Sequence, residues 1–276
     1  MRLRSLLFVP GDRPERFGKA MASGADAVIF DLEDSVAPAA KAAAAAAVAA
    51  CLARPAGVVR AVRINPLDSG RAEADLAVAA GADLVVLPKA EGAASIAALL
   101  RLCPAAPPIL PIATETPAAI FALGRYAEVA VRLGGLSWGA EDLPAAIGAE
   151  TSRTMDGRYT PPYELARSLL LFAAHAAGVA AIETVYPELR DLDGLAAYAA
   201  RGARDGFTGM LALHPAQVAP INAAFTPSAA AVARARAVVD AFAAQPGAGV
   251  LRLDGRMVDR PHLLLARKLL ERAGEA

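Results

Sequence analysis

The chain contains 276 residues, 56% of them hydrophobic, so it is long enough to bury a large core in one α/β domain or two smaller ones. Its 28 basic and 28 acidic side chains balance without forming a block of either sign, which excludes the strongly basic nucleic-acid-binding and membrane-surface classes of protein. No apolar run approaches the roughly 20 residues of a membrane span, the short N-terminal run lacks a signal-peptide pattern, and Cys51 and Cys103 match no metal or redox spacing, so we expect a reduced, cytoplasmic protein.

Short apolar runs alternate with helix-compatible segments along most of the chain. The apolar runs predict strands at residues 5–10, 27–32, 58–64, 84–87, 109–113, 129–133, 180–185 and 207–213. The intervening segments predict helices at 14–23, 38–53, 71–80, 93–102, 117–124, 163–177 and 192–203, another starting at Pro215, and a longer loop at 146–162. Continuous apolar strands suit a sheet buried on both faces, and eight strand–helix units in about 225 residues favour an α/β fold with a closed (β/α)8 TIM barrel. The alternative is a doubly wound sheet, which requires two strands to be misread.

The pattern changes after residue 226. An alanine-rich helix is predicted at 229–244, and a hairpin with an Asp254-Gly255 turn follows at 250–258. A last helix starts near Pro261. We therefore predict a catalytic barrel at 1–226 and a C-terminal helical extension at 227–276 that caps a barrel end or a neighbouring subunit.

Polar and charged residues collect where the predicted strands end, which is where a barrel carries its active site. They are Asp12, Arg13, Glu33, Asp34, Arg63, Asn65, Lys89, Glu115, Asp142, Glu183 and His214. Glu115 and Asp142 end neighbouring strands, about 4.8 Å apart, so both carboxylates can hold one cation. Two carboxylates with open positions suit Mg²⁺, and the absence of a histidine or cysteine cluster argues against zinc.

Structural roles are also open for these residues. Glu115 precedes a helix cap at Thr116, and Asp142 or Asp34 can itself cap a helix. Arg13, Arg16 and Lys19 can form a solvated helix face or bind a phosphate, and His214-Pro215 can start a helix or offer backbone amides to an anion. Trp138 can be core or pocket wall. The glycines of residues 134–144 suggest clearance for a ligand.

Seven motifs carry a resemblance to a known family. They are Leu-Phe-Val-Pro-Gly-Asp-Arg-Pro-Glu-Arg-Phe (7–17), Ala-Val-Ile-Phe-Asp-Leu-Glu-Asp (27–34), Val-Arg-Ile-Asn (62–65), Pro-Lys (88–89), Glu-Thr-Pro (115–117), Gly-Ala-Glu-Asp-Leu (139–143) and His-Pro-Ala-Gln (214–217). In this order they resemble the citrate lyase beta subunit and malyl-CoA lyase family of the HpcH/HpaI aldolase superfamily. The tail segment 254–261 also resembles that family's C-terminal segment.

The resemblance implies a Mg²⁺-dependent (β/α)8 enzyme, a homotrimer or hexamer, that cleaves or forms a carbon–carbon bond beside a CoA thioester. It implies Glu115 and Asp142 as metal ligands and Arg63 at the reacting oxygens. It assigns thioester binding to the opening motif and the His-Pro motif, with the candidates Phe8, Arg13, Arg16, Lys19, Arg63 and Pro215. Asp259 matches a tail aspartate that acts as an acid or base in a neighbouring subunit's site, and Glu33 and Asp34 are further candidates for the proton carrier. Glu183 and Met210 depart from the family pattern, which has an aspartate and often a lysine there.

We therefore expect a lyase for a 3-hydroxyacyl-CoA such as a citramalyl, malyl or citryl thioester, giving an acetyl thioester and a 2-oxo acid. Three alternatives stay open. The chain can be a citrate lyase beta subunit that acts on an acyl carrier within a complex. It can be a metal-dependent aldolase on free hydroxy-keto acids, or a non-catalytic subunit that binds CoA esters.

Overall fold

The computed structural model describes residues 1–275, which divide into two compact units, Met1–Asn222 and a second unit that begins at Ala223. Among the described residues, no helix is both long and apolar enough to cross a membrane.

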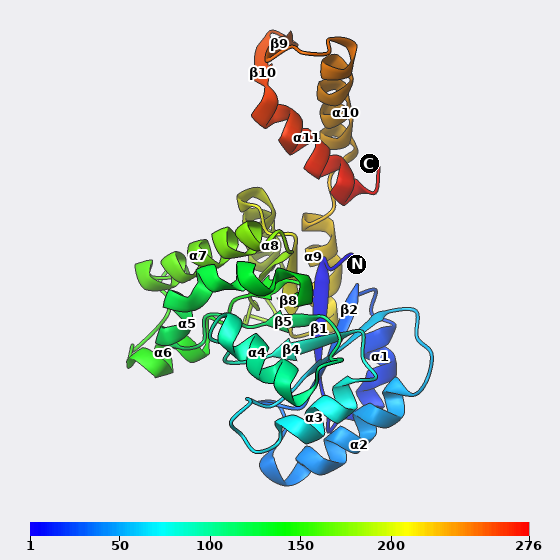
Figure 1. The fold of residues 1–276 in the computed structure, drawn as a ribbon, viewed down its shortest axis with the longest axis vertical. Helices are drawn as coiled ribbons and strands as arrows, with labels where there is room; N and C mark the ends of the chain where they lie inside the picture. The colour runs from blue at the N-terminus through cyan, green and yellow to red at the C-terminus, as the bar shows by residue number, and fades with distance from the viewer. Residues whose placement is uncertain (276) are drawn as a thin grey trace. The chain divides into compact units, whose positions relative to one another are not determined.

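Eight strands of the first unit form one parallel sheet in the order β5-β4-β3-β2-β1-β8-β7-β6 (Figure 1). Their bounds are β1 Ser5–Pro10, β2 Ala27–Asp31, β3 Val59–Arg63, β4 Leu84–Leu87, β5 Ile109–Pro111, β6 Leu136–Ser137, β7 Ala181–Glu183 and β8 Gly209–Ala212. Parallel bridges from Ile109 to Leu133 and from Ile112 to Ser137 join the two outer strands. The sheet thus closes into the predicted (β/α)8 barrel, and the doubly wound alternative is wrong.

Helical segments follow each strand and cover the outside of the barrel (Figure 1). They are η1 Pro14–Arg16, α1 Phe17–Met21, η2 Pro38–Ala40, α2 Lys41–Leu52, α3 Ala72–Ala79, α4 Ala93–Leu102, α5 Pro117–Ala122, η3 Leu123–Arg132, α6 Asp142–Ile147, α7 Pro161–Ala177, α8 Leu192–Asp205, η4 Pro215–Gln217 and α9 Val218–Ala224. The helix predicted at 14–23 is split into the 3-10 turn η1 and the helix α1, which starts only at Phe17. Arg13 lies before η1.

Apolar side chains fill the inside of the barrel. Leu6, Ile29, Ala61, Val86, Leu110, Ile182 and Leu211 belong to one buried cluster. Alternate residues of each strand supply this interior, while their neighbours face the helices. All five residues of β2 are therefore buried, which explains the continuous apolar runs in the sequence.

The prediction of a sixth strand at 129–133 is wrong. Residues 129–132 lie in η3, and the strand is the short β6 that begins after Gly134 and Gly135. These glycines do not provide ligand clearance there, because a Cβ at Gly134 would lie 2.4 Å from Leu84 Cδ1 and one at Gly135 would lie 3.1 Å from the Ala180 carbonyl oxygen. Both are needed for close strand packing.

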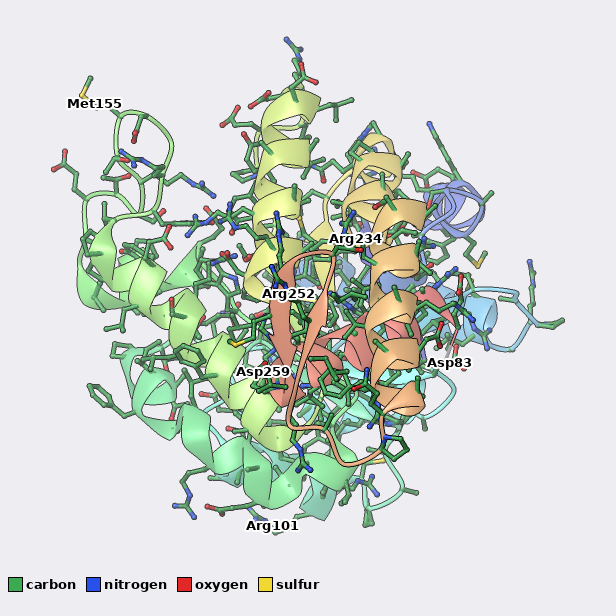
Figure 2. The ribbon with its side chains drawn as sticks, turned by 90° about the horizontal axis from the view of Figure 1, so that it is seen from above. Asp83, Arg101, Met155, Arg234, Arg252 and Asp259 are labelled. Carbon is green, nitrogen blue, oxygen red and sulfur yellow. The ribbon has the colours of Figure 1, made fainter. Side chains whose placement is uncertain are left out.

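A long surface loop interrupts the barrel's regular pattern, as expected, but it begins later. Helix α6 occupies Asp142–Ile147, and residues 148–160 then connect it to α7. Met155 is fully exposed at the tip of this loop and points away from the barrel (Figure 2).

The second unit contains α10 Ala229–Ala244, the antiparallel hairpin of β9 Val250–Leu253 and β10 Arg256–Asp259, and α11 Arg260–Ala273. The φ angles of Asp254 and Gly255 are 48° and 76°, so both turn residues adopt the left-handed conformation that a tight hairpin needs. Helices α10 and α11 pack on each other through Ala235, Ala266 and Leu270 (Figure 1). The predicted helix–hairpin–helix tail is confirmed.

Candidate active site

A cavity of about 280 Å³ lies at the carboxyl ends of the barrel strands; we call it the strand-end cavity. Its polar wall contains Asp31, Asp34, Arg63, Glu115, Asp142 and Thr184. These residues come from the ends of five strands or the loops directly after them. Charged groups from distant parts of the sequence therefore meet in one pocket.

Arg63, at the end of β3, is held by two acidic side chains. Its Nε and Nη2 donate to the two carboxylate oxygens of Asp31, both at 2.6 Å, and its Nη1 lies 2.9 Å from Glu33 Oε2. The guanidinium also lies over the Phe8 ring, 4.8 Å from its centre. Burial raises the pKa of Asp31, but Arg63 outweighs this and holds that pKa below its usual value. Such a two-pronged pair fixes the orientation of the arginine.

Lys89 joins three acidic residues. Its backbone N–H donates to Glu115 Oε2 at 2.6 Å, and its Nζ lies 3.2 Å from Glu33 and 3.6 Å from Asp142. To make these contacts Lys89 adopts a left-handed backbone with φ of 51°, which is unfavourable for a residue with a side chain. Glu115 and Asp142 are therefore brought to the same wall of the cavity, as predicted.

Gly139 makes room for Glu115. A Cβ at this position would lie 2.6 Å from Glu115 Cγ and 3.0 Å from its Oε1. The close backbone approach in the Trp-Gly-Ala-Glu-Asp segment thus accommodates a side chain of the site. Neither Glu115 nor Asp142 caps a helix, because Thr116 caps α5 and Asp142 is the first residue of α6.

The Glu115 carboxyl is buried close to other acidic groups. Burial, together with the charges of Asp142 and Glu33, raises the pKa of the Glu115 carboxyl to about 8, although the Lys89 N–H opposes the shift. Among residues 1–275, no three histidine, cysteine or acidic side chains form a metal-binding group. Glu115 and Asp142 both line the cavity, and a pair of carboxylates fits Mg²⁺, a cation that keeps water or substrate oxygens at its other positions.

Comparison with known proteins identifies the family of the chain. The family model described as HpcH/HpaI aldolase/citrate lyase matches residues 4–215. The chain belongs to the HpcH/HpaI aldolase/citrate lyase family.

Two relatives within the aldolase/citrate lyase family illustrate its range. The citrate lyase subunit beta-like protein of Mycobacterium tuberculosis is 39% identical over 274 residues, which cover 98% of this chain and 95% of that protein. The (3S)-malyl-CoA thioesterase of Cereibacter sphaeroides is 35% identical over 281 residues, which cover 98% of this chain and 94% of that protein. A solved structure of the M. tuberculosis protein CitE in complex with magnesium, acetoacetate and coenzyme A has a TM-score of 0.83 and 37% identity, and covers 98% of both chains.

The structure brings most of the residues suggested by this family resemblance together, but not all. Phe8, Asp34, Arg63, Glu115 and Asp142 line the strand-end cavity. Glu33 is buried behind it against Arg63 and Lys89. The roles of these residues remain predictions.

The remaining family-suggested residues lie outside the cavity wall. Arg13, just before η1, Arg16 of η1 and Lys19 of α1 are exposed, and Pro215 is half-buried in η4. The backbone N–H groups of Leu213 and His214 donate to the Gln217 side chain, so they do not face an anion. Asp259 belongs to the second unit, where its carboxylate accepts the His262 N–H and caps α11.

Two residues of the site have no predicted role in the sequence analysis. Asp31 lies within the predicted strand 27–32, and a carboxylate inside an apolar strand is a signal for a buried partner. Lys89 was noted at a strand end and in the Pro-Lys motif, but without a role. Its contacts depend on a left-handed backbone that no neighbouring glycine reveals.

Proposed function

We propose that the protein is a Mg²⁺-dependent lyase for a 3-hydroxyacyl-CoA of the citramalyl, malyl or citryl type. The observation that carries the proposal is the meeting of Glu115 and Asp142 on one wall of a cavity that also contains Arg63. Membership of the aldolase/citrate lyase family and the magnesium and coenzyme A in the solved CitE complex support it.

The proposed reaction breaks the bond between the carbon that bears the hydroxyl and the carbon beside the thioester. The hydroxyl proton passes to a base, and the electron pair moves onto the thioester as an enolate. Protonation of the enolate carbon gives an acetyl thioester, and the other product is a 2-oxo acid.

Glu115 and Asp142 would hold the cation. Bound Mg²⁺ supplies a Lewis acid that polarises the hydroxyl or keto oxygen of the acid. Gly139 and the Lys89 N–H keep the Glu115 carboxylate in position for this role.

Arg63 supplies a fixed positive charge at the cavity. Its orientation is set by Asp31, so it needs no reorganisation when negative charge develops on the substrate oxygens. Asp34 is exposed at the cavity wall and is the more accessible of the two candidate proton carriers in the first unit, whereas Glu33 is engaged by two cations.

We also propose that exposed Arg13, Arg16 and Lys19 bind the phosphates of coenzyme A. The chain would act as a homotrimer or hexamer in which Asp259 reaches a neighbouring subunit's site. Its half-buried position at the start of α11 leaves this carboxylate accessible.

The test is to replace the two carboxylates separately by Glu115→Gln and Asp142→Asn. Each variant should lose about 10³-fold or more in kcat/KM, because the charge that binds the cation is halved. Glu150→Gln changes an exposed acid that does not line the cavity, and it should keep most activity. Wild-type rates in both variants would refute the proposal.

A thioesterase is the second candidate, favoured by the 35% identical relative that bears the name (3S)-malyl-CoA thioesterase. The products separate the two reactions. A lyase releases an acetyl thioester and a 2-oxo acid, whereas a thioesterase releases free CoA and the intact hydroxy acid.

A further inference from the structure

Lys41, the first residue of α2, contacts the loops that follow β2 and β3. Its half-buried ammonium donates to the carbonyl oxygens of Leu32 at 2.9 Å and Glu33 at 3.0 Å, and to Asn65 Oδ1. These three uncharged oxygens match the three N–H groups of an ammonium. A positive charge at the beginning of a helix opposes the helix dipole, so α2 gains no stability from this charge. The contacts of Lys41 therefore serve the two loops rather than the helix.

Asn65 extends this hydrogen-bond network from the loop after β3 to α3. Its Nδ2 donates to the Leu32 carbonyl oxygen at 2.9 Å and to Asp75 Oδ2 at 2.6 Å. Its backbone N–H donates to the same Asp75 oxygen at 2.8 Å. Asn65 and Asp75 are each only 3% exposed. Both N–H groups and the oxygen of the Asn65 amide are paired, so the orientation of the Lys41 acceptor is itself fixed.

The two loops that Lys41 joins carry charged groups of the active site. Glu33 and Asp34 follow β2 closely, and Arg63 ends β3. The Leu32 N–H donates to the Arg63 carbonyl oxygen at 2.9 Å, so the two loops are also bonded to each other. Lys41 does not line the strand-end cavity. Any effect of Lys41 on the reaction therefore passes through the residues that these loops carry.

We infer that Lys41 is a positioning residue of the active site. This inference rests on the proposed function. The ammonium fixes the peptide groups on both sides of Glu33, which keeps the Glu33 carboxylate against Arg63 and the Asp34 carboxylate at the cavity wall. Without it the loop 32–35 gains other conformations, and the reacting groups spend less time in a productive arrangement. The loss then falls on kcat more than on KM.

The test compares the full-length wild-type chain with Lys41→Met, which removes all three donors, and Lys41→Gln, which keeps an amide donor. Hydrogen–deuterium exchange followed by mass spectrometry measures the opening of the loop 32–35 relative to β8 of the same chain. The Glu33 and Ser35 N–H groups donate to the Asp31 carboxylate, so their exchange reports whether the loop keeps its conformation. Values of kcat and KM are measured in parallel with Mg²⁺ and the best thioester.

In Lys41→Met we expect the amides of residues 32–35 to exchange about tenfold faster or more, relative to β8, because the loop opens locally. We expect kcat to fall about 10- to 100-fold while KM changes less than about threefold, the scale of a small misplacement of reacting groups. Lys41→Gln should show both effects to a smaller degree. Leu99→Ala, a buried core change in α4, should lower the free energy of unfolding but leave the relative exchange and kcat near wild type.

Wild-type exchange of residues 32–35 in Lys41→Met would overturn the inference, and so would faster exchange with an unchanged kcat. If the methionine variant does not fold, Lys41→Gln decides by the same two measurements. An equal fall of kcat in Leu99→Ala would also overturn the inference, because the effect would then follow stability alone. The proposed function fails separately, if the wild-type chain cleaves no thioester, and the exchange series still decides whether Lys41 holds the loop.

Discussion

Arg63 is surrounded by acidic groups that fix its guanidinium beside the cavity. Its Nε and Nη2 donate to the two carboxylate oxygens of Asp31. Glu33 lies beside Nη1, and the Asp34 carboxylate lies 4.0 Å from the same nitrogen. A lysine would keep one positive charge but would lose the fork that fits Asp31. The geometry of the charge, rather than its presence, is therefore the property to test.

We expect Arg63→Lys to lower kcat/KM about 10²- to 10³-fold, the loss usually seen when one positioned group at developing charge is removed. Steady-state kinetics with the best thioester measure the effect. Arg60→Lys, on the same strand but paired with Asp83 away from the cavity, is the matched control and should stay near wild type. Equal losses in both variants would contradict the role given to Arg63.

The site residues differ in how far the sequence predicts them. Glu115, Asp142 and Arg63 stand in short motifs at predicted strand ends, so their meeting follows from barrel topology. Lys89 contacts Glu33 and Asp142 from a left-handed backbone. Such a conformation arises from the surrounding tertiary structure, and a single sequence carries no pattern for it.

At the scale of elements, a buried ion pair joins α7 to β7. Arg167 Nε lies 2.7 Å from Glu183 Oε2, and its Nη1 lies 2.9 Å from Asp205 at the end of α8. The guanidinium also lies over the Phe207 ring, 4.7 Å from its centre. Removing one partner of such a pair leaves a buried charge without its main counter-ion.

We predict that Arg167→Met lowers the free energy of unfolding by about 3 kcal/mol, within the usual range for a broken buried pair. Urea denaturation followed by circular dichroism measures this. Arg201→Met breaks a partly exposed pair with Glu164 and should cost less than about 1 kcal/mol. A cost for Arg167→Met no larger than that of Arg201→Met would show that the buried pair contributes little.

A second ion pair joins the beginnings of β1 and β2. Asp26 accepts the Arg4 backbone N–H at 2.8 Å and the Arg4 side chain at 2.9 and 2.8 Å. Burial raises the pKa of Asp26, but the Arg4 bonds outweigh it and lower that pKa. The pKa of Asp26 in the folded state is below the unfolded value of about 3.9. The stabilisation is therefore fully present at pH values above the unfolded pKa, and it is lost as the pH falls through the folded-state pKa.

Asp26→Asn should therefore lower the free energy of unfolding by about 1–2 kcal/mol at pH 7. This figure allows for solvent screening of the Arg4 charge. The difference from wild type should shrink as the pH is lowered below about 4. Urea denaturation at several pH values measures it, and Asp68→Asn, at an exposed position, is the control. A difference that grows at low pH would have the wrong sign for this pair.

The misplaced sixth strand shows why some elements escape prediction. The run Val129 to Leu133 has strand-like composition, yet residues 129–132 belong to η3, which continues α5, and only Leu133 forms a parallel bridge, to Ile109. The real strand has two residues and follows two glycines, which are required by contacts with Leu84 and Ala180. Those contacts come from β4 and the start of β7, so only the assembled barrel explains them.

At the scale of the whole molecule, the alternation of strands and helices predicts the barrel, because each strand–helix unit packs against its neighbours in the same way. Closure through β5 and β6 then places the carboxylates of Glu115 and Asp142 in one cavity. Family membership and this geometry both support the proposed cation-assisted chemistry.

The most direct test is to incubate the purified full-length protein with citramalyl-, malyl- and citryl-CoA, with Mg²⁺ or with excess EDTA, and to measure the products by mass spectrometry. We predict acetyl-CoA and a 2-oxo acid in equal amounts from at least one thioester with Mg²⁺, and a loss of about 10³-fold or more in rate with EDTA. Release of free CoA with an intact hydroxy acid, or cleavage that is insensitive to EDTA, would contradict a Mg²⁺-dependent lyase.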